Sequence, residues 1–171
     1  IATDPDADRM GLAVLNKTGD YVFLTGNQIG ALLLSTLLED KKNQNTLPNN
    51  GVVIKSIVTS ELGQAIADSY DVKMMNVLTG FKFISEEIEK FHETKESTFL
   101  FGYEESFGYL IGDFVRDKDA VQASVLIAEA AARYKEKGLT LLDGLDALYE
   151  EHGYYQEALE SLTLRGKSGM A

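Results

Sequence analysis

The run VVIKSIV, at residues 52–58, is followed directly by Thr59 and Ser60 and sets the pattern for the rest of the chain. Its β-branched residues favour a strand, and the two hydroxyl residues can cap a helix that we expect over residues 61–70. A second strand is predicted over residues 72–77, and another strand follows the next predicted helix. Strands that alternate with helices at these lengths indicate an α/β layer with parallel strand pairings.

The segment before this unit predicts a β-hairpin and a helix. Two β-prone runs, at residues 11–15 and 21–24, surround a polar turn, which is a hairpin signal. A helix is expected from Gly26 to about Lys42. The residues predicted for its buried face are Ile29, Leu32, Leu33, Thr36 and Leu37.

The segment after the central unit predicts one further helix and two further strands. Ser85 is expected to cap the helix, because two glutamates follow it in the first turn, where the helix dipole favours them. The strands are expected over residues 98–101 and 109–111.

Two helices and a strand are predicted for the last third of the chain. The longest helical pattern covers residues 118–137 and places Gly138 at the C′ position. Thr140 with Asp143 resembles a capping box for a last helix, and residues 154–164 alternate weakly, which indicates a strand. The periodic apolar residues of the long helix are Val121, Val125, Ala128 and Ala132.

The composition is that of a globular chain with one core. Of 171 residues, 44% are hydrophobic, and the formal net charge is −11. That charge argues against general nucleic-acid or anionic-membrane binding, because phosphate surfaces favour clustered Lys and Arg. The chain has no cysteine, which excludes disulfides and thiolate metal sites and fits a cytoplasmic protein. Because Ile1 is not an initiator methionine and the first motif follows it at once, we expect a piece of a longer protein.

The first motif is the acidic run Asp4-Pro5-Asp6-Ala7-Asp8-Arg9. Three carboxylates at alternate positions of a turn can direct several oxygens at one centre, and such oxygens suit a hard divalent cation such as Mg²⁺. An EF-hand loop is rejected, because Arg9 and Leu15 stand where that loop needs Gly and Glu. A solvated acidic turn without a metal is the simpler alternative.

Three further loops follow predicted strands and carry groups that can bind a ligand. Thr79–Lys82 pairs a glycine with a lysine that can reach a phosphate, although an ordinary turn explains it equally well. Gly102–Tyr109 holds two carboxylates and a serine, which suit the recognition of sugar hydroxyls. Arg116–Asp119 opens the long helix with Asp117 as the expected N-cap, and two cations there hint at a bound anion.

A hydrolase nucleophile at Ser106 is a competing interpretation of the second of these loops. The residues around Ser106 lack the Gly-x-Ser-x-Gly pattern of a nucleophile elbow, and the two histidines, His92 and His152, belong to predicted helices. We therefore favour sugar binding over nucleophilic catalysis for this loop.

Together, the four motifs resemble the α-D-phosphohexomutase superfamily, and most closely its bacterial phosphoglucomutase and phosphomannomutase branch. Asp4–Arg9, Thr79–Lys82, Gly102–Tyr109 and Arg116–Asp119 occur in the order and approximate spacing of that family. The resemblance implies a three-layer α/β/α domain with a mixed, partly parallel sheet, preceded by a β-hairpin. It further implies that residues 1–25 end a second domain, 26–153 form a third domain, and 154–171 lead to a missing fourth domain.

The same resemblance implies a metal site and a neighbouring catalytic arginine. Asp4, Asp6 and Asp8 would hold Mg²⁺, and Arg9 would lie near an enzyme phosphoserine. The family's phosphoserine motif, of Thr/Ser-Ala-Ser-His-Asn-Pro type, does not occur in this sequence. We therefore expect the chain alone to be catalytically inactive.

The resemblance also assigns residues to the substrate. Glu104 and Ser106 match the positions that read the 3- and 4-hydroxyls of the sugar. Lys82 and Lys118 match positively charged positions of the substrate cleft, and Arg116 is a further expected substrate-binding residue. Lys118 is also a candidate for proton transfer if its pKa is lowered by Arg116 and the metal.

The implied activity is the interconversion of hexose 1-phosphate and hexose 6-phosphate, with glucose as the expected sugar. It would proceed through the phosphoserine and a bisphosphorylated sugar of the glucose 1,6-bisphosphate type. The expected partners are a sugar phosphate and the missing domains of the same chain, without nucleic acid or membrane. The alternatives are a phosphomannomutase, a phosphopentomutase, or a non-catalytic sugar-phosphate-binding domain.

Overall fold

The computed structural model describes residues 1–158 and 160. Two short antiparallel pairs come first: β1 (Ala2–Thr3) with β2 (Met10–Gly11), and β3 (Ala13–Leu15) with β4 (Tyr21–Phe23). The predicted hairpin is therefore confirmed in the second pair. The elements that follow are α1 (Gly26–Asn43), β5 (Gly51–Ser56), α2 (Leu62–Ser69), β6 (Lys73–Val77), α3 (Phe81–Thr94), β7 (Thr98–Glu104), β8 (Gly108–Ile111), α4 (Ala120–Glu136) and α5 (Leu141–His152).

The main sheet has the strand order β6-β5-β7-β8. Strand β5 pairs in parallel with both β6 and β7, whereas β8 pairs antiparallel with β7. The stretch VVIKSIV thus supplies a central strand, and all six residues of β5 are buried. The prediction of a mixed, partly parallel sheet is confirmed.

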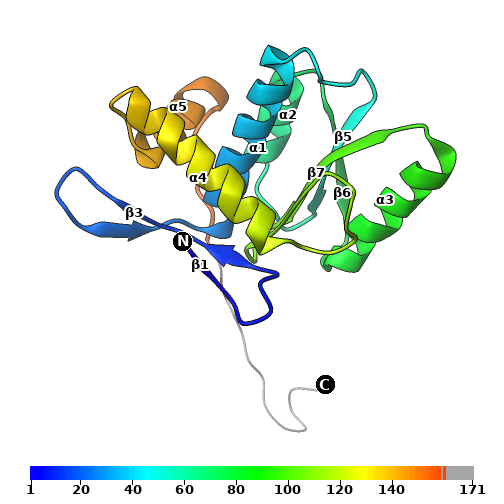
Figure 1. The fold of residues 1–171 in the computed structure, drawn as a ribbon, viewed down its shortest axis with the longest axis horizontal. Coiled ribbons are helices and arrows are strands. Elements are labelled where there is room, and N and C mark those ends of the chain that lie inside the picture. The colour runs from blue at the N-terminus through cyan, green and yellow to red at the C-terminus, as the bar shows by residue number, and fades with distance from the viewer. Residues whose placement is uncertain (159, 161–171) are drawn as a thin grey trace, which may run out of the picture.

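Helices cover both faces of the sheet, as Figure 1 shows. On one face, α1, α2, α4 and α5 share a core with inward residues of the sheet such as Val53 and Phe101. On the other face, α3 packs alone over Val52, Ile54 and Phe99. Alternate residues of β5 therefore pack into the cores on opposite faces of the sheet, as the alternation of side chains along a strand requires. The three-layer arrangement is confirmed.

The helix starts confirm some predicted caps and correct others. Thr140 and Asp143 form the predicted capping box of α5. Helix α3, however, begins at Phe81 rather than at Ser85, because Phe81 is buried in the core beneath α3 and extends the helix by one turn. Ser85 therefore lies inside the helix, where its hydroxyl donates to the carbonyl of Phe81 at 3.1 Å. Glu61 occupies the N-cap of α2 without a side-chain cap, while the hydroxyl of Ser60, one of the two predicted cap residues, accepts from the backbone N–H of Leu62 at 3.2 Å.

The long helix α4 corrects two further predictions. Its N-cap is Asp119 rather than Asp117, with the Asp119 carboxylate accepting from the backbone N–H groups of Val121 and Gln122. The predicted apolar face is exposed: Val121 and Val125 are 62% and 65% accessible. Small residues and one isoleucine form the buried face instead, since they allow α4 to lie close to its neighbours; they are Ala120, Ala123, Ile127 and Ala130.

The end of the described chain has no regular structure over residues 154–158. The strand predicted for residues 154–164 is therefore absent from that part, and its remainder lies outside the described residues. Within the described residues, no helix has the combination of length and apolar character that a bilayer span needs.

Candidate functional site

The acidic loop between β1 and β2 brings its three aspartates together. One carboxylate oxygen from each of Asp4, Asp6 and Asp8 lies within 4.8 Å of the others. Oxygens bound to one Mg²⁺ at about 2.0–2.1 Å would be separated by roughly 3 to 4 Å, so the donor set fits that ion after small side-chain movements. The carboxylates predicted as metal ligands are thus gathered by the fold.

The loop is closed by its own hydrogen bonds. Asp4 Oδ1 accepts from the backbone N–H of Arg9 at 3.1 Å, and the Asp4 carbonyl accepts from the N–H of Ala7 at 3.1 Å. Ala7 adopts a left-handed conformation with φ 56°, which turns the chain sharply. The hydrogen bond from Arg9 lowers the pKa of the Asp4 carboxyl, so this group stays charged down to a lower pH than an isolated aspartate.

The acidic loop also contacts two segments that are distant in the sequence. The backbone N–H of Met10 donates to the carbonyl of Phe107, in the loop between β7 and β8, at 3.2 Å. The N–H of Ala120, in the first turn of α4, donates to the carbonyl of Ala7 at 3.1 Å. Three of the four predicted motifs therefore meet at one end of the sheet.

Lys118 links these segments through ion pairs. Its Nζ lies 3.1 Å from Asp8 Oδ2 and 3.0 Å from Asp117 Oδ1, and its side chain is 11% exposed. Burial alone would lower the pKa of Lys118, but the hydrogen bonds to Asp117 and Asp8 outweigh burial and raise it. Carboxylates rather than Arg116 thus surround the ammonium group, and the lowering of this pKa by a neighbouring metal stays a prediction.

The predicted sugar-binding loop lies beside Lys118. Glu104 is 5% exposed at the end of β7, and its Oε1 accepts from the backbone N–H of Gly80 at 2.7 Å. A Cβ added at Gly108 would lie 2.4 Å from Lys118 Cδ and 3.7 Å from Glu104 Oε2. The absence of a side chain at Gly108 therefore lets Lys118 pack next to Glu104. Ser106 is partly buried in the turn that joins β7 to β8.

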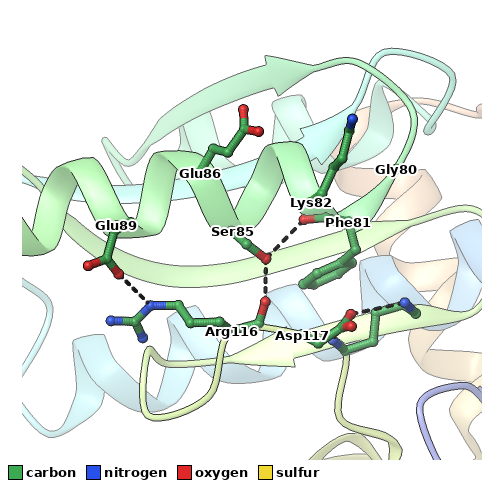
Figure 2. Close-up of a pocket in the computed structure, with 9 residues that line it drawn as sticks. Gly80, Phe81, Lys82, Ser85, Glu86, Glu89, Arg116 and Asp117 are labelled. Atoms are coloured by element: carbon green, nitrogen blue, oxygen red, sulfur yellow. Dashed lines mark hydrogen bonds and ion pairs between the residues drawn. The ribbon is translucent and has the colours of Figure 1, made fainter.

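An open pocket of about 630 Å³ extends from Lys118 along the start of α3. Besides Lys118, two predicted cations line this pocket, Lys82 and Arg116. Figure 2 shows that their side chains point apart. Arg116 Nε donates to Glu89 at 3.1 Å, whereas Lys82 points away from that pair and lies with its Nζ 4.7 Å from the ring centroid of Phe83. Lys82, Arg116 and Lys118 thus line one pocket without converging on a single point.

Sequence reasoning missed a buried polar cluster next to the loop of Glu104. Lys55, fully buried in β5, donates to the Thr59 carbonyl and to Glu61 Oε1, both at 2.9 Å. Ser56 and Thr59 place their hydroxyls against the carboxylate of Glu105. A lysine and a serine within the strand VVIKSIV were the available signal, because buried polar side chains need partners.

The fold and these loops define a domain of the phosphohexomutase type. The family described as "Phosphoglucomutase/phosphomannomutase, alpha/beta/alpha domain III" matches residues 25–152. The chain belongs to this family.

Relatives by sequence carry the name phosphoglucomutase. The Staphylococcus haemolyticus protein is 44% identical over 169 residues, which cover 99% of this chain and 30% of that protein. The Staphylococcus aureus (strain N315) protein is 43% identical with the same coverage. The chain therefore spans under a third of the length of these relatives.

Solved structures agree with this assignment. A Thermus thermophilus protein assigned to the phosphomannomutases is 26% identical with a TM-score of 0.66, covering 89% of this chain and 30% of that chain. An Aspergillus fumigatus N-acetylphosphoglucosamine mutase, solved with GlcNAc-6P and magnesium, has a TM-score of 0.59 at 15% identity and covers 85% of this chain and 34% of its own. The second likeness concerns the fold alone.

Proposed function

We propose that this chain supplies the metal loop and the sugar-binding loop of a phosphohexomutase that interconverts glucose 1-phosphate and glucose 6-phosphate. The observation that carries the proposal is the meeting of the two loops, through the hydrogen bond from Met10 N to the Phe107 carbonyl and the ion pair from Lys118 to Asp8. The identity with proteins named phosphoglucomutase supports glucose as the sugar.

In this proposal, Asp4, Asp6 and Asp8 hold Mg²⁺, which neutralises negative charge on a phosphoryl group during its transfer. Arg9 is half exposed, with 51% of its side chain accessible, and its Nε is 3.9 Å from Asp8 Oδ1. The guanidinium is thus free to turn onto a phosphate oxygen beside the acidic loop.

The sugar would bind at the end of β7. Glu104 and Ser106 would read its 3- and 4-hydroxyls, since the second oxygen of Glu104 lies beside Gly108 and is not the one bonded to Gly80. Lys118 is the proposed proton-transfer group, because its Nζ lies 3.1 Å from Asp8 Oδ2 at the edge of the same pocket. Lys82 and Arg116 would bind phosphate oxygens after leaving their present partners.

The remaining parts of the mechanism would come from outside this chain. A phosphoserine, a bisphosphorylated intermediate of the glucose 1,6-bisphosphate type, and the grip on the distal phosphate belong to the other domains. Residues 1–25 would complete a preceding domain, residues 26–153 form the third, and residues 154–171 lead to a fourth. We place the whole enzyme in the cytoplasm and expect the present chain alone to be inactive.

The test is a coupled mutase assay on the full-length protein with glucose 1-phosphate, mannose 1-phosphate and ribose 1-phosphate in parallel. Turnover that is fastest with glucose 1-phosphate and is lost in Glu104→Ala, with unfolding unchanged, supports the proposal. Preference for mannose or ribose phosphate would favour a phosphomannomutase or phosphopentomutase. Binding of a sugar phosphate without turnover would favour the non-catalytic domain.

A further inference from the structure

Glu105 turns away from the pocket and is held by a different loop. Its Oε2 accepts from Ser56 Oγ at 3.0 Å and from Thr59 Oγ1 at 3.2 Å. Its backbone N–H donates to the same Thr59 hydroxyl oxygen at 3.2 Å. Both hydroxyl residues are buried, with 0% and 3% of their surface accessible. A buried hydroxyl pair that donates to a carboxylate makes charge-assisted hydrogen bonds, which are stronger than neutral ones.

The loop after β5, which contains Thr59, is itself held in place by Lys55. Lys55 donates to the Thr59 carbonyl at 2.9 Å, and its fully buried ammonium group also bonds Glu61. On the other side, the start of α1 abuts the backbone of Glu105, because a Cβ added at Gly26 would lie 1.9 Å from the Glu105 carbonyl oxygen. Glu105 is thus confined by its side chain, its N–H and its carbonyl.

The two neighbours of Glu105 are the residues that face the substrate in the proposed function. Glu104 has one oxygen bonded to the N–H of Gly80 at 2.7 Å, and Ser106 lies in the turn beyond Glu105. Because adjacent residues share rigid peptide planes, fixing the N–H and the carbonyl of Glu105 restricts where the backbone of both neighbours can lie. A displacement of about 1 Å in such groups can cost up to about a hundredfold in rate.

We propose that Glu105 is a positioning residue, which holds Glu104 and Ser106 in place for the sugar hydroxyls through its hydrogen bonds to Ser56 and Thr59. The inference rests on the proposed function. It assigns the specificity for ring hydroxyls partly to the connection between β5 and α2, which itself lies outside the pocket.

The experiment compares glucose 1-phosphate with its 3-deoxy analogue in the full-length protein. Dissociation constants by calorimetry and kcat/KM are measured for the wild type, Glu105→Ala, Glu105→Gln and Ser56→Ala. Glu93→Ala, an exposed residue of α3, is the matched control. A positioning residue affects binding only through the hydroxyl that the analogue lacks. Removing its side chain should therefore weaken binding of glucose 1-phosphate but leave binding of the analogue nearly unchanged.

For Glu105→Ala we expect a loss of roughly tenfold to a hundredfold in kcat/KM for glucose 1-phosphate, and less than about threefold for the analogue. Glu105→Gln keeps an acceptor oxygen and should recover part of the loss, and Ser56→Ala should show a smaller version of the same pattern. Equal losses for both sugars, or no loss for either, would overturn the inference. Absence of turnover by the wild type overturns the proposed function alone, because the binding comparison still decides the role of Glu105.

Discussion

The ammonium nitrogen of Lys118 lies 3.1 Å from Oδ2 of Asp8, so the segment before α4 neutralises part of the acidic loop. A divalent cation on that loop would lie close to this ammonium group. Like charges at such a distance repel, and the repulsion is little screened because the Lys118 side chain is 11% exposed. The ion pair and the proposed metal therefore compete for Asp8.

Replacing Lys118 with methionine should tighten Mg²⁺ binding. We expect an affinity about threefold to tenfold higher in Lys118→Met, because one like charge is removed and Asp8 is released. Calorimetric titration of the chain with Mg²⁺ measures this change. Lys17→Met is the control, since Lys17 pairs with Asp143 instead. Weaker binding in Lys118→Met would contradict the competition.

Gly26→Ala should destabilise the fold. The added methyl group would lie 1.9 Å from the backbone oxygen of Glu105, and backbone cannot swing aside as a flexible side chain can. We expect a loss of about 1–3 kcal/mol in the free energy of unfolding, measured by urea denaturation. In the matched variant Gly11→Ala, the added methyl group would lie 4.0 Å from the carbonyl oxygen of Ala2, so stability should change little.

The contribution of Asp143 to stability should depend on pH. Its hydrogen bond from Lys17 and its bonds to Thr140 lower its pKa from 3.8 to about 2. Because the folded-state pKa lies below the ordinary value, this contribution is present above pH 3.8 and is lost as the pH falls toward about 2. The stability difference between wild type and Asp143→Asn should therefore shrink over that range. A difference that grows on acidification would refute the assignment.

Substitutions on the two faces of α4 should differ in how much they change the free energy of unfolding. Val125 is 65% exposed and Ile127 is fully buried. Val125→Gln should change the free energy of unfolding by less than about 0.5 kcal/mol, whereas Ile127→Ala should cost about 2–5 kcal/mol. Urea denaturation of both variants tests this contrast. A large loss of stability in Val125→Gln would indicate that the face predicted from periodicity is the buried one.

Periodicity predicted the alternation of strands and helices well and failed where two patterns coexist. The strand around Val53 and the face of α1 that includes Ile29 and Leu33 are buried as expected. In α4, apolar residues occupy both faces, so spacing alone could not choose between Val125 and Ile127. Close packing against the rest of the core selected the face that carries Ile127 and the alanines next to it.

The sequence indicated which groups meet at one end of the sheet, but it did not indicate their interactions. The aspartates of the acidic loop and Glu104 lie where the motifs placed them, at one end of the sheet. Sequence could not show that carboxylates surround Lys118, because Asp8 comes from a loop more than a hundred residues earlier and meets Lys118 only in the folded chain. It also did not predict the partners of Glu105, which are Ser56 at the end of β5 and Thr59 in the loop that follows.

Local sequence was enough to establish the alternation of strands and helices, the family, and the chemical groups in each loop, because these depend on local propensity and on short runs of residues. Which of those groups are free to bind a ligand was settled by the folding of the whole chain. Long-range contacts direct Lys118 to Asp8, Arg116 to Glu89 and Glu105 to Ser56. The pairing of a charged group depends on what the fold brings near it, which local sequence does not encode.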